Sequence, residues 1–511
     1  MKLPEYSWWV KHAHKDSAFL FLIEEPALFT QQVLSRLDKV GRGGESEQSK
    51  QEVVNQAMWR ATFEQDRFGA MTTILEDIQA YPERLNTLKP VQQIGNTIGD
   101  EDGPFLALGV SAFWIPWAYR YDRGQFNRFA RWASGAGFRY VRWFGAHNWD
   151  GGTPTPEAFP QGRSAYFDLM RSCIEGLAQH GLYSFITFAT RREMFSSAEE
   201  VYDVGVRWGR LVKECRDSVI GVEMVNEAMH PHNKWNEGAV RNMLSMFRHG
   251  NNAEHPIASL TAPSGLDSYE DIKHQLVSLY SGSEATAATV HHSRKKTGES
   301  PWRWIRQPWH TKHGITPDLT SEGVRLVIDN EPERWDKSTG GRNLAVAVAA
   351  PIVSWICGSA MTCHHDNYGV HNKRGEYGGS SAHQQLGEVF RAVLPLLPAD
   401  LPNWKSVRVG TDDWHPFPNL LEQHWVDAGV EKGINRAYAA VNPRSAAGWT
   451  EYVMVLTGVR VSVRLEGRSF RYMALGGPSP GILKDHSGGP CVLNQSDSEA
   501  WLVMSNTGEW S

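Results

Sequence analysis

The sequence has few of the features that mark membrane, nucleic-acid-binding or disulfide-rich proteins. Its 511 residues include only five cysteines, scattered and without Cys-x-x-Cys spacing, so we expect reduced thiols rather than a disulfide framework or a zinc knuckle. No run approaches the ~20 apolar residues of a membrane span. The formal net charge of −5 predicts no basic surface for nucleic acid or for a membrane.

The N-terminus shows no secretory signal. Its one apolar run, residues 18–23, is followed directly by Glu24 and Glu25, whereas a signal peptide needs a longer run and a small-residue cleavage site. We therefore expect a cytoplasmic protein, although export by a non-standard route would require no signal of this kind.

From about residue 104 the sequence alternates between apolar stretches and amphipathic helical stretches. Helical spacing is clear in Phe126, Phe129 and Ala133, which lie on one face of a helix. Strand character is found at residues 105–110, 138–145, 182–189, 219–227, 257–262, 287–292, 324–331 and 359–364. Eight strand–helix units in roughly 290 residues predict an α/β fold, a (β/α)₈ TIM barrel, over residues 98–398.

A doubly wound open sheet is the alternative fold. In a nucleotide-binding sheet of that kind, a glycine-rich, phosphate-binding turn follows the first strand. Residues 111–116 read SAFWIP and contain no glycine, which favours the barrel.

The regions that flank the barrel differ from it in pattern. Residues 1–97 are polar and mostly helical in period, and we expect an N-terminal extension used for packing or docking. In residues 399–511 the helical period stops, and strands are expected at 437–441, 452–456, 459–465, 471–474 and 500–504. This predicts a small β-sandwich or antiparallel sheet, which we expect to support the barrel more than to bind a ligand.

Two of the expected strands end in a glutamate. Residues 219–227 read VIGVEMVNE and residues 324–331 read VRLVIDNE. Barrel enzymes carry their chemistry at the C-terminal strand ends, so Glu227 and Glu331 should face each other across one mouth. Alternation of side chains would put Glu223 on the face of Glu227, and Asp329 on that of Glu331, as interior groups paired with a cation.

At these positions residues 104–395 resemble the clan of retaining glycoside hydrolases built on (β/α)₈ barrels. The resemblance is carried by Asn226 and Glu227 at the end of the fourth strand, Glu331 at the end of the seventh and Arg142 late in the second. It implies that Glu227 is the general acid/base, that Glu331 is the nucleophile paired with Arg142, and that Asn226 holds the sugar 2-hydroxyl. His291 matches the histidine often found after the sixth strand.

The sequence departs from that clan at two places. Ser293 stands where a tyrosine is frequent, and the end of the eighth strand has His364 and His365 where a tryptophan is common. These departures leave the sugar and its linkage open. Further substrate-binding candidates at the mouth are His147, Trp149, His292 and His364, and the loop residues Trp302, Trp304 and Trp309 are also candidates for stacking on a sugar.

The chemistry of such a pair needs no cofactor. Retention requires one ionised carboxylate that attacks the anomeric carbon and one protonated carboxyl that releases the leaving group, and a nearby arginine keeps the attacking group ionised. We expect a β-glycosidase that acts on an oligosaccharide, a polysaccharide or a glycoside.

Two other functions are compatible with the sequence. The first is a metal-dependent barrel hydrolase, for which His230, His232, His291, His292, His364, His365 and Asp366 would be ligand candidates, although no His-x-His ends the first strand. The second is a non-catalytic glycan-binding or structural protein.

Overall fold

The structure is a computed structural model. It describes residues 88–147, 163–252, 254, 257–263, 269–291, 302, 305, 307–331, 343–371, 377–409, 421–423, 436–444, 451–457, 461–465, 469–487, 489–493 and 498–506. The expected helical extension lies outside these residues as far as residue 87 and stays a prediction there.

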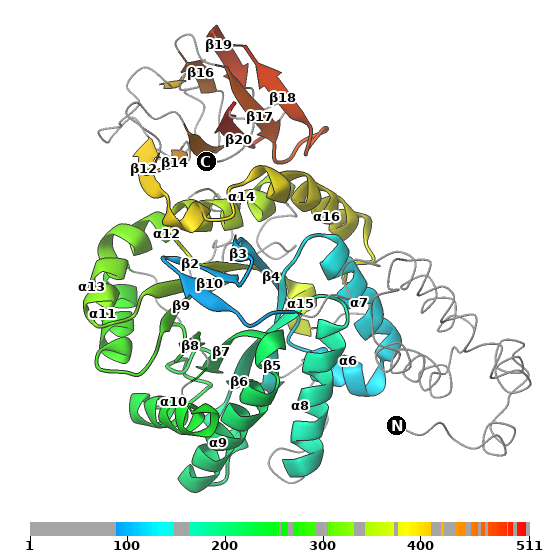
Figure 1. Cartoon of the computed structure of the whole chain (residues 1–511), viewed down its shortest axis with the longest axis vertical. Helices are drawn as coiled ribbons and strands as arrows, with labels where there is room; N and C mark the ends of the chain where they lie inside the picture. Colours follow the sequence, from blue (N-terminus) through cyan, green and yellow to red (C-terminus); the bar gives the residue numbers. More distant parts are fainter. Residues whose placement is uncertain are drawn as a thin grey trace, which may run out of the picture. The chain divides into compact units, whose positions relative to one another are not determined.

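Eight parallel strands form a nearly closed sheet in the order β8-β7-β6-β5-β4-β11-β10-β9 (Figure 1). The edge strands meet through a backbone hydrogen bond of 3.0 Å from Thr286 N to Ala258 O. The predicted (β/α)₈ barrel is thus confirmed. The strands are β4 (Ala107–Ser111), β5 (Tyr140–Ala146), β6 (Tyr183–Ala189), β7 (Val219–Val225), β8 (Ala258–Ser259), β9 (Ala287–His291), β10 (Leu326–Glu331) and β11 (Met361–His364).

Helices surround this sheet, and polar side chains cap several of them. Ser197 accepts a hydrogen bond from the Glu200 amide, and Glu200 in turn accepts one from the Ser196 amide, so that one amide of the first turn and the amide before the cap are satisfied. The helices are α6 (Ile115–Tyr121), α7 (Arg123–Gly135), α8 (Arg163–Ala178), α9 (Ala198–Glu214), α10 (Glu237–Asn251), α11 (Tyr269–Tyr280), α12 (Gln307–His310), α13 (Thr316–Ser321), α14 (Leu344–Ile356), α15 (Asn367–His371) and α16 (Ser381–Val393).

Shorter helical segments complete the connections between these elements. Part of the connection from β9 to β10 is helical, from α12 to α13 through a π-helix at Thr311–Ile315. The 3₁₀ segments are η1 (Arg192–Met194), η2 (Arg216–Ser218), η6 (Leu394–Leu396) and η7 (Leu401–Asn403). None of the helices in the described part of the chain is both long and apolar enough to cross a membrane.

The N-terminal end of the barrel is closed by a small antiparallel sheet. It contains β1 (Gln92–Ile94), β2 (Thr97–Asp100) and β3 (Gly103–Phe105). Ile98 and Phe105 pack in one cluster with interior residues such as Tyr140 and Phe185. Residues 88–97, assigned by sequence to the helical extension, therefore belong to the barrel, because their apolar side chains cover its lower end.

Helix α14 is apolar on all sides because it is covered on all sides. It contacts β11 of the barrel and also β14, β15 and β20 of the C-terminal region, and Tyr438, Val453 and Leu502 share the main core cluster with it. An all-apolar helix of this kind is expected only where no face meets water.

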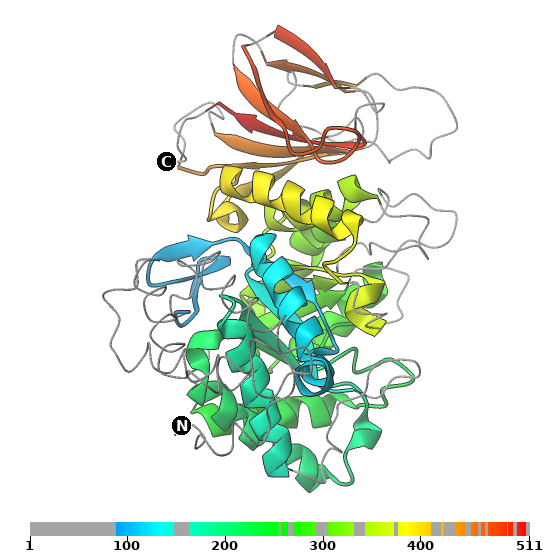
Figure 2. The same ribbon diagram turned by 90° about the vertical axis from the view of Figure 1, so that its right-hand side faces the viewer.

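The C-terminal region consists of antiparallel strands, as predicted (orange to red in Figure 2). Six strands form one sheet in the order β12-β14-β15-β20-β17-β18, and three form a second in the order β13-β16-β19. The strands are β12 (Lys405–Val409), β13 (Leu421–Gln423), β14 (Arg436–Val441), β15 (Tyr452–Thr457), β16 (Val461–Leu465), β17 (Phe470–Ala474), β18 (Leu483–His486), β19 (Gly489–Leu493) and β20 (Ala500–Ser505).

Candidate active site

The barrel interior changes from apolar to polar along the strands. Near the N-terminal ends it is filled by residues such as Tyr140 and Phe185. Further toward the C-terminal ends come Arg142, Thr187 and Glu223, all fully buried. Because buried charges are costly unless they are paired, this layer must form a connected network.

Arg142 is the centre of that network. Its Nη1 donates to Glu331 Oε1 at 2.7 Å, and its Nη2 donates to Asn226 Oδ1 at 2.8 Å and to Glu223 Oε2 at 3.2 Å. The guanidinium carbon lies 5.2 Å from the ring centre of Phe113 and 5.3 Å from that of Phe144. One cation from β5 thus orients residues from β7 and β10.

Glu223 lies below the mouth and is held from two sides. Thr187 Oγ1 donates to its Oε2 at 2.7 Å, beside the bond from Arg142. Burial raises the pKa of the Glu223 carboxyl, and Arg142 and the Thr187 hydroxyl offset only part of that rise. The expectation of an interior carboxyl paired with a cation holds for Glu223.

The expectation that Asp329 lies on the same face as Glu331 is wrong. Its Oδ2 accepts from Ser354 Oγ of α14 at 2.5 Å, so it points to the helical layer, while Glu331 points to Arg142. The register between β9 and β10 shifts between Asp329 and Glu331. A β-bulge at this point breaks the alternation of side chains and re-aims the following residue, which separates two residues that strict alternation would put on one face.

Glu331 is nearly inaccessible, with 5% of its side chain exposed. Besides Arg142, two imidazoles lie near it: His291 Nε2 is 3.7 Å from Oε1, and His365 Nε2 is 3.7 Å from Oε2. Ser111 Oγ lies 3.0 Å from His365 Nδ1. Cationic or donor groups therefore approach both oxygens of this carboxylate.

Glu227 is more open, with 27% of its side chain exposed. Its Oε1 lies 3.2 Å from His291 Nδ1, and His291 Nε2 lies 3.4 Å from Arg142 Nη2. Because the guanidinium can only donate, a neutral His291 would accept at Nε2 and donate from Nδ1 to Glu227. A single imidazole thus lies between the two candidate carboxylates.

His365 lies in this cluster, whereas the described contacts of its neighbour His364 are with Asp366 and Phe138. His364 Nε2 lies 3.9 Å from Asp366 Oδ2, and its ring is 6.2 Å from that of Phe138, which packs on α16. His383 of α16 lies 3.2 Å from the same Asp366 oxygen. Burial raises the pKa of Asp366, but the neighbouring imidazoles of His364 and His383 outweigh it and hold the pKa well below its usual range.

The other predicted substrate-binding residues have contacts of their own. His147 is buried, with its ring 6.1 Å from that of Phe144. Trp302 does not face the mouth, since its Nε1 donates to Glu499 Oε2 of the C-terminal region at 3.1 Å, and the Trp309 ring lies 3.9 Å from that of His313. The remaining candidates lie outside the described residues: Trp149, His292 and Trp304.

Sequence reasoning missed the stacked pair Phe113 and Phe144. Their ring centres are 3.8 Å apart with the planes 10° from parallel, and they pack against the guanidinium of Arg142. The signal was weak, because both read as ordinary apolar residues of a strand and a loop.

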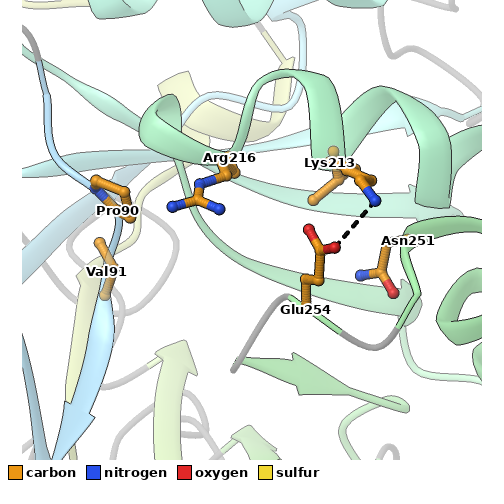
Figure 3. A pocket seen from close by; sticks show the side chains of 7 residues that line it. Pro90, Val91, Lys213, Arg216, Asn251 and Glu254 are labelled. Carbon is orange, nitrogen blue, oxygen red and sulfur yellow. Dashed lines mark hydrogen bonds and ion pairs between the residues drawn. The ribbon is translucent and has the colours of Figure 1, made fainter.

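A small cavity lies at the other end of the barrel. It encloses about 120 Å³ and is lined by Val91, Val212, Lys213, Arg216 and Glu254 with Pro90 and Asn251 (Figure 3). These residues precede β7, end α10 or follow α10, whereas Glu227 follows β7 directly, so the cavity is separate from the carboxylate pair. Within the described ranges no three or more His, Cys, Asp or Glu side chains are grouped as a metal site.

The comparisons with known proteins show the fold. No protein-family model and no curated protein matches the sequence. The structure is similar to one described as "Glycoside hydrolase", with a TM-score of 0.54 and 11% identity over 83% of this chain and 98% of the other. It is equally similar to a glycoside hydrolase family 5 protein from Bacteroides vulgatus, with a TM-score of 0.54 and 10% identity over 82% and 94%. The resemblance to barrel glycoside hydrolases is thereby confirmed at the level of fold.

Proposed function

We propose that this protein is a retaining glycoside hydrolase that cleaves an O-glycosidic, β-linked bond through Glu227 and Glu331. The observation that carries the proposal is the arrangement of the two groups. The Glu331 carboxylate is buried and hydrogen-bonded to Arg142, the Glu227 carboxylate is partly open to solvent, and His291 lies between the two. Two carboxyl groups in unlike surroundings suit the two roles that glycoside hydrolysis requires.

In the first step Glu331 is the nucleophile. An oxygen of its carboxylate forms a bond to the anomeric carbon as the bond to the leaving oxygen breaks, and Glu227 transfers its proton to that oxygen. The assignment follows from the contacts, because the hydrogen bond from Arg142 at 2.7 Å favours the ionised form of Glu331. The exposed fraction of Glu227 leaves room for a leaving group.

In the second step water hydrolyses the glycosyl ester on Glu331, and Glu227 acts as the general base. Glu227, now ionised, takes a proton from water, whose oxygen attacks the anomeric carbon and releases Glu331. The configuration at that carbon is inverted twice and so retained. Asn226, held by Arg142 at 2.8 Å, is placed next to the nucleophile, where the amide would bind the 2-hydroxyl of the sugar.

Substitution of each carboxylate tests this function. With a panel of β-linked oligosaccharides and of aryl β-glycosides that have poor leaving groups, E227A and E331A should each lose about 10²- to 10⁴-fold or more in kcat/KM, the range for loss of a positioned acid or base. Azide should restore turnover of E227A with activated substrates, because a small anion can replace water without a general base.

The matched control is Glu322→Ala. Glu322 follows α13 at the opposite end of the barrel, where it accepts a hydrogen bond from Ser281. This variant should retain the wild-type kcat/KM. Hydrolysis by E227A or E331A at the wild-type rate would overturn the proposed function.

A further inference from the structure

The backbone at Glu227 has a conformation that side chains rarely adopt. Its φ angle is +41°, and among described non-glycine residues only Lys234 and Asn252 share a positive φ. A residue held in this region is strained and keeps its place only where the surroundings determine it. The groups that hold this turn therefore decide where the Glu227 carboxyl points.

Asn233 holds the turn from one side. Its Nδ2 donates to the Asn226 carbonyl at 2.9 Å and to the Glu227 carbonyl at 3.0 Å. The Asn233 side chain is buried, and its backbone carbonyl accepts from the Arg192 amide at 2.8 Å. The side-chain amide of Asn233 thus fixes two successive peptides, and its backbone carbonyl links them to the loop after β6.

The barrel holds the turn from the other side. The Asn226 amide donates to the Ala189 carbonyl of β6 at 2.9 Å, and the Ala228 amide donates to Thr261 Oγ1 at 2.9 Å. The backbone amides of the residues before and after Glu227 are therefore held by β6 and by the segment that follows β8. The Glu227 carbonyl also accepts from the His230 amide at 2.9 Å, so among the described contacts the Asn226 carbonyl is the group that Asn233 alone holds.

We propose that Asn233 is a positioning residue that holds the strained Glu227 turn and so sets the aim of the acid/base toward the leaving group. This inference rests on the proposed function. Asn233 touches neither Glu331 nor Arg142 in any described contact, so its loss should affect proton transfer and not nucleophilic attack. Small errors in placement are costly, since about 1 Å of misplacement can reduce a rate by about 10²-fold.

The dependence on the leaving group separates these two effects. A 2,4-dinitrophenyl glycoside departs with little protonation, whereas a 4-methoxyphenyl glycoside of the same sugar needs the acid. We would measure kcat/KM, which reports the first step, for wild type, Asn233→Ala and Asn233→Asp. The Asp variant keeps the side-chain volume and removes both donors, and thermal melting would establish that each variant is folded.

The inference predicts a selective loss. In N233A and N233D the kcat/KM for the 4-methoxyphenyl glycoside should fall by about 10²-fold, while that for the dinitrophenyl glycoside stays nearly unchanged. The matched control is Asn236→Ala in the same loop. Asn236 is exposed and caps α10 by accepting from the Ala239 amide, so its loss should lower stability and leave the ratio of the two substrates unchanged.

Two other sets of results would overturn either the positioning role of Asn233 or the proposed function. Equal loss with both glycosides in folded N233A and N233D, or no loss with either, would overturn the positioning role while the proposed function stands. A wild type that hydrolyses neither glycoside for any sugar of the panel would overturn the proposed function, and this inference with it.

Discussion

Arg142 and Glu331 are joined by a hydrogen bond of 2.7 Å between Nη1 and Oε1, with the side chains 0% and 5% exposed. The two residues come from β5 and β10 and are 189 positions apart in sequence. Arg142 also contacts Glu223 and Asn226, so two buried carboxylates depend on one guanidinium.

Removal of this cation should destabilise the barrel. In Arg142→Met both Glu223 and Glu331 lose their charged partner, and breaking a buried pair by removing one member costs about 3–5 kcal/mol. We expect this loss in the free energy of unfolding in urea at neutral pH, together with loss of hydrolysis.

The double variant R142M/E223Q is the control for that explanation. Because Glu223→Gln removes one of the two uncompensated carboxylates and keeps its volume, the double variant should be more stable than R142M. An R142M protein with an unchanged unfolding midpoint would contradict the central role of Arg142.

Glu223 should give stability a dependence on pH. Its folded pKa is raised above the ordinary value of 4.5 by burial, so the folded state binds the proton more tightly than the unfolded state does. Stability from this group is fully present below that value and is lost as the pH rises through the folded pKa. Wild type should therefore lose stability relative to E223Q as the pH rises from 4 to 7, and a constant difference would contradict the shift.

Asp366 should show the opposite dependence. Its pKa lies below the ordinary value of 3.8 because His364 and His383 outweigh burial, so its contribution is present above that value and lost as the pH falls. We expect Asp366→Asn to cost about 3 kcal/mol at neutral pH, as when a buried pair is broken. The cost, measured by denaturant unfolding, should shrink below pH 4; a cost that stays the same there would argue against an ionised Asp366.

The pair of adjacent histidines after β11 offers a matched comparison. His365 lies 3.7 Å from Glu331, whereas His364 faces Asp366. We expect H365A to lower kcat/KM by about tenfold, equivalent to about 1.4 kcal/mol at the transition state. H364A should chiefly lower the melting temperature. The reverse pattern would show that the wrong histidine has been placed at the nucleophile.

The sequence predicted the barrel well because each of its strands is apolar and short, and all but the sixth are followed by a clear helical period. The two glutamates followed from the rule that parallel strands end at one mouth. All eight strands are found within a few residues of their expected positions.

Side-chain directions at the strand ends were less predictable. Alternation paired Asp329 with Glu331, but the register shift in β10 depends on pairing with β9, which is a long-range property. The turn with the positive φ of Glu227 is likewise bonded to Asn233 across a loop and to Thr261, which is 33 positions from Ala228 in sequence, and no local pattern reveals these contacts. Local sequence therefore predicts which residues reach the mouth better than how they point.

The most direct test of the central claim is intact-mass spectrometry after incubation with a panel of activated 2-fluoro β-glycosides. The proposed mechanism predicts one covalent glycosyl adduct, on a peptide that contains Glu331, and its absence in E331A. An adduct on another carboxylate, or inverted product from a sugar that the protein hydrolyses, would contradict it.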